Sequence, residues 1–464
     1  MKKVLWILNK YVDGSNTHRY YPYFLSDLEE ELRKYGIQLS FVFFSDKLKD
    51  NLRTKNNYFF KNIQNITNYP EEAQRIENDY SFTFKQAYFP EIIQVSKSQD
   101  HRKILVPEKD FNDLDHLVDH FLYLEDLIKK EGIDIVMSDQ APEAEMEFGR
   151  AICLKKGLVY LKYNENFLGN SLFHQQFEFG EETLVEATQQ RISHEEAKIF
   201  VEDFVKHEKL PYVEKEMCPS NDPFYFLRKI AHLYDYRSEI KRILLKPYYY
   251  LEEKIAKKLI QDKFVPTEKY LFFGFHMPTE STVGLRALPY MNQTSLIESI
   301  SRVLPFGYKL YVREHPGYKQ DFSYSYLKRI KRMPNVSLIP TSIPIHKILR
   351  NSDGVLTYNA TTGIESLMYG KPVLSFAPNV YYKHHSGALF CANLFELGSK
   401  LVQLINTKID QEETIKYMQK MFSISVPVSI MAPNFISEED SLAKAKTFAE
   451  CFDRAINHIN SRKV

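Results

Sequence analysis

The chain of 464 residues is longer than one hydrophobic core usually organises, so two domains of roughly 200 residues each are expected. Its hydrophobic fraction of 44% and charged fraction of 26% are those of an ordinary globular protein and exclude a disordered or fibrous chain. The 61 lysines and arginines balance 60 aspartates and glutamates, which excludes the strong positive field of a general nucleic-acid-binding protein. Any phosphate binding must therefore be local.

The four cysteines stand far apart without a CxxC pair, which argues against a zinc site or a disulfide framework and fits a reducing cytosol. The apolar run within residues 1–9 is too short for a signal-peptide core or a membrane span. Nowhere else do about 18 apolar residues follow one another. We therefore expect a cytoplasmic protein.

The first half of the chain has the pattern of an α/β domain. A buried strand is expected over residues 3–8, then a helix that starts at Pro22 and closes at Gly36, then a strand over 37–44. Strands joined in this way by a helix run parallel. The same rhythm returns later as helix 114–130, strand 133–138, helix 144–156 and strand 158–163.

Two segments interrupt this rhythm. Residues 47–109 are polar and rich in aromatic residues, and we interpret them as helices and loops inserted in the first domain. Residues 221–264 have the pattern of long helical segments in which Pro247 forces a break or a kink. This second segment is the expected junction between the domains.

The second half of the chain alternates strands and helices again and predicts a second doubly wound sheet. Two such domains facing each other leave a cleft at the carboxyl ends of their strands, where open α/β sheets bind ligands. The expected elements are strand 270–275, helix 295–303, strand 309–313, helix 324–332, strand 336–339, helix 344–350, strand 354–357, helix 363–369 and strand 372–376.

Three loops at strand ends in this half carry the residues suited to ligand binding. The first holds His276 and Glu280, on either side of Pro278. In a cleft, a ring nitrogen and a carboxylate so placed can hold sugar or ribose hydroxyls. A turn that satisfies its own polar groups would explain the same residues, and both interpretations stay open.

The second loop follows strand 309–313 and begins with Glu314, His315 and Pro316. The proline fixes the backbone direction, and an imidazole at the carboxyl end of a strand suits a phosphate, although a lone histidine is often structural. Arg313 belongs with Glu314 and His315 among the candidates for the nucleotide. It can instead point back into the domain and pair with an acid, because alternation places it opposite Glu314.

The third loop is small and rich in hydroxyl groups, and it runs into the start of a helix. Exposed amide groups and threonine hydroxyls converge there, which favours an anion, and a carboxylate in the first helical turn can accept both ribose hydroxyls. Alternatively, a threonine caps the helix and the carboxylate favours its positive end. The candidate residues are Asn359, Thr361, Thr362, Gly363 and Glu365.

In this order the motifs FHMPTES, YVREHPG and NATTGIESLMYGKPVLSF resemble the C-terminal domain of bacterial capsule and surface-polysaccharide biosynthesis glycosyltransferases. That GT-B group includes the Kdo transferases of capsule export. The resemblance covers about residues 270–382, and only the rhythm of strands and helices extends it to the first half. The chain departs from the family in the spacing between Pro278 and Glu280, and at Asn359-Ala360, where a glycine-containing start is usual.

The resemblance implies a GT-B fold, that is, two Rossmann-like doubly wound domains facing a central cleft. It also implies that His315 contacts the donor phosphate and that Glu365, with the threonine turn, holds ribose and phosphate. The expected parts are an acceptor-side domain with a helical insertion (1–220), a helical linker (221–265), a nucleotide-sugar-binding domain (266–435) and a C-terminal helix that crosses back to the first domain (436–464).

An inverting transfer would need a carboxylate to deprotonate the acceptor hydroxyl, and we expect it from the first domain. Strand 133–138 delivers Asp139, and strand 158–163 is followed by Glu165. These two are the candidates for the base, with Glu143 and then Glu145 in reserve. All four would otherwise simply solvate loop ends.

The polar loop after the first strand resembles the acceptor-side loop of GT-B enzymes. Asp13, His18 and Arg19 are its candidates for binding an acceptor glycan, although the loop has no GxGxxG pattern. Residues 222–263 hold ten basic and six acidic side chains with interleaved aromatics, which would suit an anionic membrane near lipid-linked acceptors. A helical linker with a solvated face explains that segment equally well.

The predicted function is therefore transfer of a sugar from a nucleotide-activated donor to a surface glycan or a lipid-linked acceptor, at the inner face of the membrane or free in the cytoplasm. The donor would be linked to CMP, UDP or GDP. No DxD stands at a strand end, so we expect neither a metal nor a cofactor beyond this co-substrate. The alternatives are a sugar-nucleotide 2-epimerase of the same fold and a non-catalytic glycan-assembly protein.

Overall fold

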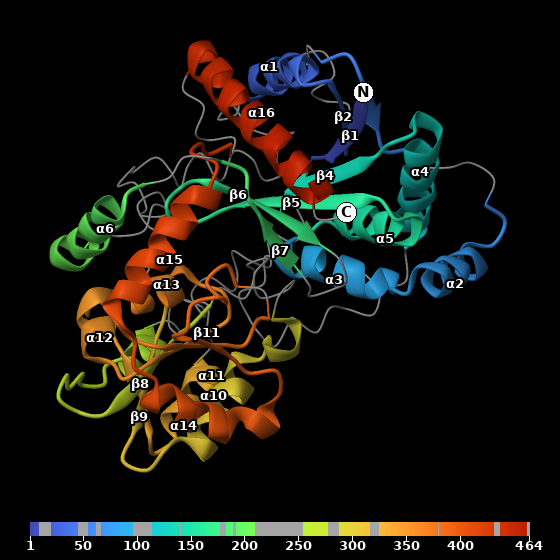
Figure 1. The fold of residues 1–464 in the computed structure, drawn as a ribbon. Coiled ribbons are helices and arrows are strands. Elements are labelled where there is room, and N and C mark those ends of the chain that lie inside the picture. Colours follow the sequence, from blue (N-terminus) through green and yellow to red (C-terminus); the bar gives the residue numbers. More distant parts are fainter. Residues whose placement is uncertain are drawn as a thin grey trace. The chain divides into compact units, whose positions relative to one another are not determined.

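The fold is that of a computed structural model, and its two sheets are shown as a ribbon in Figure 1. The structure describes residues 1–8, 20–44, 54–61, 66–95, 114–139, 141–176, 182–188, 192–208, 254–276, 287–315, 324–378, 380–430 and 437–461. Most of the basic segment 222–263 lies outside these ranges.

The chain divides into two compact units, each built on one sheet. Unit 1 holds the described residues within Met1–Val95, Val106–Ile199 and Ile415–Val464, and unit 2 holds those within Phe200–Thr414. Both units combine parallel strands with covering helices, which confirms the predicted α/β class with two Rossmann-like domains. The division falls after residues 199 and 414, whereas the sequence led us to expect boundaries after 220 and 435.

The sheet of unit 1 has the order β3-β2-β1-β4-β5-β6-β7. Its strands are parallel from β3 to β5, and β6 and β7 are antiparallel additions at one edge. The elements are β1 (Lys2–Ile7), α1 (Tyr21–Lys34), β2 (Ile37–Phe43), β3 (Asn57–Phe59), α2 (Tyr69–Tyr80), α3 (Phe84–Val95), α4 (Asp115–Glu131), β4 (Ile135–Asp139), α5 (Ala144–Lys156), β5 (Val159–Glu165), β6 (Ser171–Gln176), β7 (Glu182–Val185), α15 (Gln411–Ile424) and α16 (Glu438–Ser461), with α6 (His194–His207) across the division between the units.

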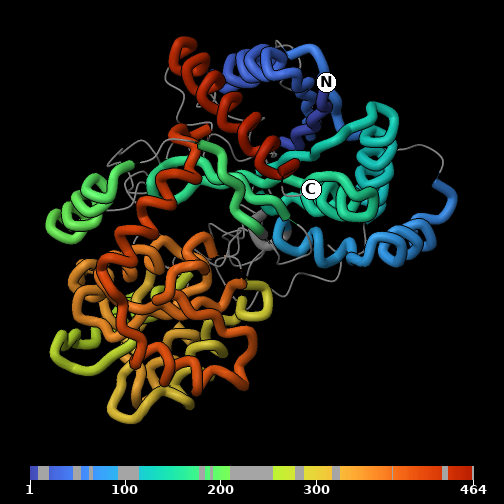
Figure 2. Tube along the Cα trace, in the orientation of Figure 1, coloured from blue at the N-terminus to red at the C-terminus, as the bar shows by residue number. Residues whose placement is uncertain are grey.

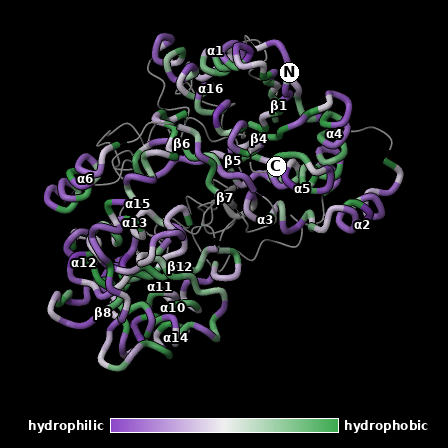
Figure 3. The backbone as a smooth tube through the Cα atoms, in the orientation of Figure 1, coloured by the Kyte–Doolittle hydropathy of each residue, from purple (hydrophilic) through white to green (hydrophobic). Residues whose placement is uncertain are grey.

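Strand β1 shows why the central strands of this sheet have uninterrupted apolar sequences. Val4 and Trp6 point to the core shared with α1 and α16, whereas Leu5 and Ile7 point to the core shared with α4 and α5. A parallel sheet covered on both faces has no solvent side, so its central strands carry no polar alternation. The covering helices do alternate, as the mixed colours along α4 and α5 show (Figure 3).

The C-terminal helix α16 packs in unit 1 beside α1 (Figure 2). The ring of Phe448 stacks on that of Trp6, with 6.1 Å between centroids and 9° between planes. Helix α1 presents the other wall of this contact through Phe24, Leu25 and Leu28. The last segment of the chain therefore completes the core that the first segment begins.

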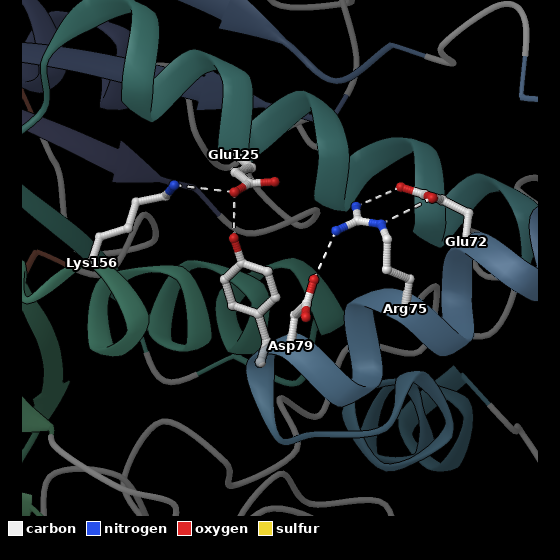
Figure 4. Close-up of polar contacts among 6 residues, drawn as sticks. Glu72, Arg75, Asp79, Glu125 and Lys156 are labelled. Carbon is white, nitrogen blue, oxygen red and sulfur yellow. Dashed lines mark hydrogen bonds and ion pairs between the residues drawn. The ribbon is translucent and has the colours of Figure 1, made fainter.

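Helix α2 is attached to the body of unit 1 by polar contacts (Figure 4). Glu125 of α4 accepts hydrogen bonds from the hydroxyl of Tyr80 and, at 3.1 Å, from Nζ of Lys156 on α5. Arg75 pairs with Glu72 and Asp79 within α2 itself. Glu125 thus links three helices, while the pairs of Arg75 are exposed and add little to stability.

The sheet of unit 2 has the order β10-β9-β8-β11-β12-β13 and is parallel throughout. This is the Rossmann order, with its topological switch point between β8 and β11. The elements are β8 (Tyr270–Gly274), η7 (Leu288–Tyr290), α10 (Gln293–Val303), β9 (Lys309–Arg313), α11 (Tyr324–Lys331), β10 (Val336–Ile339), α12 (Ile345–Asn351), β11 (Val355–Thr357), α13 (Thr361–Met368), β12 (Val373–Ser375), β13 (Ala388–Phe390), η8 (Leu394–Glu396) and α14 (Leu397–Asn406).

Helices α10, α11 and α14 cover one face of this sheet, and their buried residues form one core with β8 to β12. The helices of the parts described here include none that is long and apolar enough to cross a bilayer.

Candidate functional site

The candidate site lies at the carboxyl ends of β8 and β11, on either side of the switch point of unit 2. His276 stands two residues after β8, and Thr357 is the last residue of β11. Open α/β sheets bind ligands in the crevice that such a reversal of strand order creates. The residues predicted from the second and third loops follow β9 and β11 at this same edge.

His276 joins the two sides of the switch point. Its Nε2 accepts a hydrogen bond from the amide of Tyr358 at 3.1 Å and lies 3.2 Å from the hydroxyl of Thr357. Because Nε2 accepts, the ring proton belongs on Nδ1. The main chain of His276 is held in turn by the side-chain amide of Gln293, with bonds of 2.9 and 2.8 Å. His276 therefore acts on the site by positioning the start of the β11–α13 turn.

Burial and the neighbouring His315 lower the pKa of His276 to about 3. An unfolded chain restores a pKa near 6.5, so the unfolded state binds more protons between these two values. Stability should therefore fall as the pH drops below about 6.5, by at most about 1.4 kcal/mol per pH unit from this group.

His276→Gln tests this expectation, because glutamine offers an acceptor for the Tyr358 amide but does not titrate. Urea midpoints measured near neutrality and near pH 5 should differ less in the variant than in the parent. An equal loss of stability in both proteins would contradict the role given to His276.

The turn between β11 and α13 presents unused donors and an unused acceptor. The amide of Ala360 donates to the Thr357 hydroxyl at 3.3 Å. The amides of Thr361 and Thr362, at the N-terminus of α13, donate to no described residue, and Oδ1 of Asn359 is enclosed without a partner among the described residues. Helix N-termini favour anions through such amides and through the helix dipole. This turn is suited to a phosphate group.

Gly363 is required by close packing in the first turn of α13. A Cβ atom there would lie 2.3 Å from the hydroxyl oxygen of Tyr382 and 2.4 Å from its Cζ. Tyr382 is completely buried, so its ring has little room to move. The sequence indicates Gly363 only as part of a turn. The structure shows that the absence of a side chain at Gly363 makes room for Tyr382.

We expect Gly363→Ala to displace either Tyr382 or the first turn of α13. Overpacking of this kind costs about 1–3 kcal/mol. The loss should appear in the urea midpoint, and nucleotide binding should weaken with it. Gly398→Ala is the matched control, because its Cβ would meet Val303 at an ordinary 3.7 Å. Equal stability of the two variants would refute the packing argument.

Glu365 lies in the second turn of α13, because the helix begins at Thr361 and not at Gly363 as predicted, and it is completely buried. Its carboxylate is one turn before Tyr369, whose pKa it contributes to raising after the larger effect of burial. The helix dipole acts on carboxylates mainly within the first turn, so it stabilises the Glu365 carboxylate little. Binding a ribose through Glu365 would require the ligand to reach below the surface of the turn.

Arg313 supplies positive charge at this edge of the sheet, and His315 lies beside it. Arg313 is buried, and its Nη1 donates to the carbonyl of Ile343 at 3.0 Å, which ties the end of β9 to the loop before α12. Burial, and then the Arg313 guanidinium, lower the pKa of His315. His315 is therefore neutral at physiological pH, and an N–H group of its ring is what it can offer to an anion. Glu314 and His315 are both partly exposed.

His346 at the start of α12 belongs to the same edge and was missed in the sequence. It is buried, its Nδ1 lies 2.8 Å from the hydroxyl of Tyr369, and its Nε2 has no partner among the described residues. Arg313 is among the groups that lower its pKa, after burial. Nothing in its sequence context, a histidine within an apolar helix, distinguishes it from a core residue.

In unit 1 the structure brings two predicted carboxylates to one place. Asp139 is paired in register with Tyr163 of the adjacent strand β5, and Glu165 follows Tyr163 by two residues on the same face. Burial, then Tyr21, Asp139 and Glu165, raise the pKa of Tyr163. The hydroxyls of Tyr21 and Tyr163 are hydrogen-bonded to each other, so both phenols stand beside the carboxylates. We refer to Asp139, Glu165, Tyr21 and Tyr163 as the acid cluster.

The predicted acids of this half differ in their further contacts. Glu165 accepts a hydrogen bond from the hydroxyl of Ser429, which lies beyond α15. Glu143 is buried at the N-cap of α5. Glu145 is completely buried and lies 2.6 Å from Nδ1 of His120 on α4. Glu145 therefore serves the packing of α4 against α5, while Asp139 and Glu165 stay the predicted bases.

Several predicted residues lie outside the described part of the chain. They are Glu280 of the first loop and the acceptor candidates Asp13, His18 and Arg19. Their roles stay predictions. Within the described ranges, no three His, Cys, Asp or Glu side chains are grouped as metal ligands would be.

Three solved structures are distantly similar to this chain. The β-Kdo 2,7 transferase KpsC of Thermosulfurimonas dismutans is 12% identical, with a TM-score of 0.35 over 69% of this chain and 87% of that chain. MnaA of S. aureus, solved with UDP, is 12% identical, with a TM-score of 0.29 over 100% and 97%. The UDP-GlcNAc 2-epimerase of Methanocaldococcus jannaschii is 11% identical, with a TM-score of 0.26 over 91% and 99%. With scores this low, neither the site residues nor the activity of these proteins can be assigned to this chain.

Among curated proteins, no sequence matches the chain. A family profile does match: residues 180–384 fit the family described as capsule polysaccharide biosynthesis protein. The matched segment contains all the described candidates of unit 2, from His276 to Glu365. Residues 180–384 thus resemble the capsule polysaccharide biosynthesis protein family, as the motifs of the second half predict.

Proposed function

We propose that the protein is a cytoplasmic, metal-independent glycosyltransferase that uses a nucleotide-activated sugar and no further cofactor. Its acceptor would be a surface glycan or a lipid-linked glycan. One observation carries the proposal: at the Rossmann switch point of a chain from a capsule-biosynthesis family, α13 begins with unused amides beside the enclosed Oδ1 of Asn359. A phosphate-bearing ligand fits that arrangement.

The donor would lie across the carboxyl ends of β8, β9 and β11. Its phosphate oxygens accept hydrogen bonds from the amides and hydroxyls of Thr361 and Thr362 and from the ring of His315. Arg313 supplies positive charge from behind, since its guanidinium is held by the carbonyl of Ile343. Glu365 accepts the ribose hydroxyls.

The acid cluster of unit 1 would supply the base. A carboxylate close to a buried phenol pair is held in one geometry, and general-base catalysis needs such positioning more than it needs flexibility. Either Asp139 or Glu165 would take the proton of the acceptor hydroxyl as the sugar is transferred. The leaving nucleotide phosphate keeps its contacts with the turn before α13, which stabilises the charge that develops there.

The proposal is tested by following the fate of the donor. A thermal-shift screen with CMP, CDP, UMP, UDP and GDP identifies the preferred nucleotide, and the matching sugar nucleotides are then incubated with and without lipid-linked glycan acceptors. A glycosyltransferase releases nucleotide in an acceptor-dependent way and yields a heavier glycan by mass spectrometry. A sugar-nucleotide 2-epimerase instead converts the donor without an acceptor. Nucleotide binding without either product would support the non-catalytic alternative.

A further inference from the structure

Unit 2 carries fully exposed aromatic side chains on the helical layer formed by α10, α11 and α14. Phe306, in the turn after α10, and Phe395, in η8, have relative exposures of 105% and 103%. Large apolar residues are normal on a surface when they are scattered, but not when they gather.

Exposed apolar residues lie on, or within a few residues of, the contact between α10 and α14. A Cβ atom on Gly398 would lie 3.7 Å from that of Val303, so the end of α10 touches the start of α14 (Figure 1). Phe306 lies three residues after Val303, and Phe395 lies three residues before Gly398. The exposed members of this apolar patch are Val303, Phe306, Leu394, Phe395 and Val402.

The apolar patch is not needed for the core of unit 2. The same helices bury a separate set of residues, such as Leu296, Ile300, Leu397 and Leu401, against the sheet. The exposed residues of the patch are therefore not required for packing these helices against the sheet. Their exposure costs solubility and points to contact with something else.

The charge around the apolar patch indicates what that contact is. Helices α10, α11 and α14 together with η8 carry five basic and two acidic side chains, and one of the bases, Lys331, pairs with Asp262 outside these elements. One of the acids, Glu298, pairs with both Arg302 and Arg329, which holds these two cations on the same layer. A second copy of the chain, related by a twofold axis, would bring this positive layer against itself. An anionic lipid surface attracts basic residues and accepts phenyl rings at its interface.

We propose that the apolar patch docks unit 2 on an anionic lipid bilayer, with Phe306 and Phe395 inserted at the level of the headgroups. The contact is separate from the candidate donor site and does not depend on glycosyl transfer. It also differs from the basic segment 222–263, which the sequence suggests for a membrane.

The proposal is tested by sedimentation of the full chain with vesicles of phosphatidylethanolamine and phosphatidylglycerol, and with vesicles of phosphatidylcholine alone. The parent should bind the anionic vesicles, and Phe306→Ser/Phe395→Ser should bind them about tenfold or more weakly, because two apolar side chains leave the interface. The control Tyr35→Ser/Ile199→Ser removes two exposed apolar residues elsewhere and should bind as the parent does.

Phe306→Ser/Phe395→Ser, called the phenylalanine variant, should fold normally, because the two rings that it removes are exposed in the parent. Its urea midpoint, compared with that of the parent, verifies this. No binding of the parent to anionic vesicles, or equal binding by parent and phenylalanine variant, would overturn the proposal. A change in molar mass by light scattering, without a change in vesicle binding, would assign the apolar patch to a second copy of the chain.

Discussion

Replacing one base candidate, Asp139 or Glu165, is expected to lower turnover about a hundredfold or more while leaving nucleotide affinity unchanged. The reason is that deprotonation of the acceptor contributes only in the transition state. Asp139→Asn and Glu165→Gln keep the size of each side chain within the acid cluster. Steady-state kinetics with the true acceptor, together with calorimetric titration of the nucleotide, separate turnover from binding.

The matched control for these variants is Glu145→Gln. Glu145 is a buried carboxylate of the same half, but it contacts His120 rather than the acid cluster, so its loss should affect stability more than turnover. If Asp139→Asn and Glu165→Gln both retain near-parental turnover, the base lies elsewhere. Glu143 is then the next candidate within the described residues, and Asp13 is the next outside them.

A second large effect is expected on nucleotide binding. His315→Ala and Glu365→Ala should each weaken it about tenfold to a hundredfold, which corresponds to the loss of a hydrogen bond that involves a charged group. Glu365 is completely buried, so Glu365→Gln is needed as a variant that keeps its volume and tests folding separately.

His174→Ala serves as the control for this pair of variants. His174 is a buried histidine of unit 1 whose Nε2 lies 2.7 Å from Oδ1 of Asn164, so its loss disturbs packing without touching the candidate site. If both His315→Ala and Glu365→Ala bind the preferred nucleotide as tightly as the parent, the donor-site assignment is wrong.

Most of the regular structure could be predicted because its signals are local. Strand β9 and helix α5 have the predicted bounds, and α4 and α5 end where Gly132 and Gly157 adopt positive φ. In contrast, the antiparallel strands β6 and β7 were not predicted. Their place at the edge of the sheet depends on pairing with β5, and part of it on a bridge from Ser171 to Val426, far along the chain.

The candidate site also has features that the local sequence indicates and features that depend on residues distant in the chain. A turn at a strand end can be read from the sequence, but the start of the next helix was placed at Gly363, whereas α13 begins at Thr361 and Glu365 lies in its second turn. Partners distant in the chain cannot be read, as with the Tyr358 amide that occupies His276, or with Tyr382 against Gly363. Tyr21 and Tyr163 were missed for the same reason, since only the folded sheet brings them beside Asp139.

The central claim, that unit 2 binds the donor nucleotide at the start of α13, is tested most directly by hydrogen exchange read by mass spectrometry. The preferred nucleotide should slow exchange in peptides that cover residues 357–366 and 313–315, where amides and side chains meet the phosphate. Glu365→Gln should reduce that protection at the same nucleotide concentration. Protection confined to unit 1, or none in residues 357–366 at saturating nucleotide, would contradict the account.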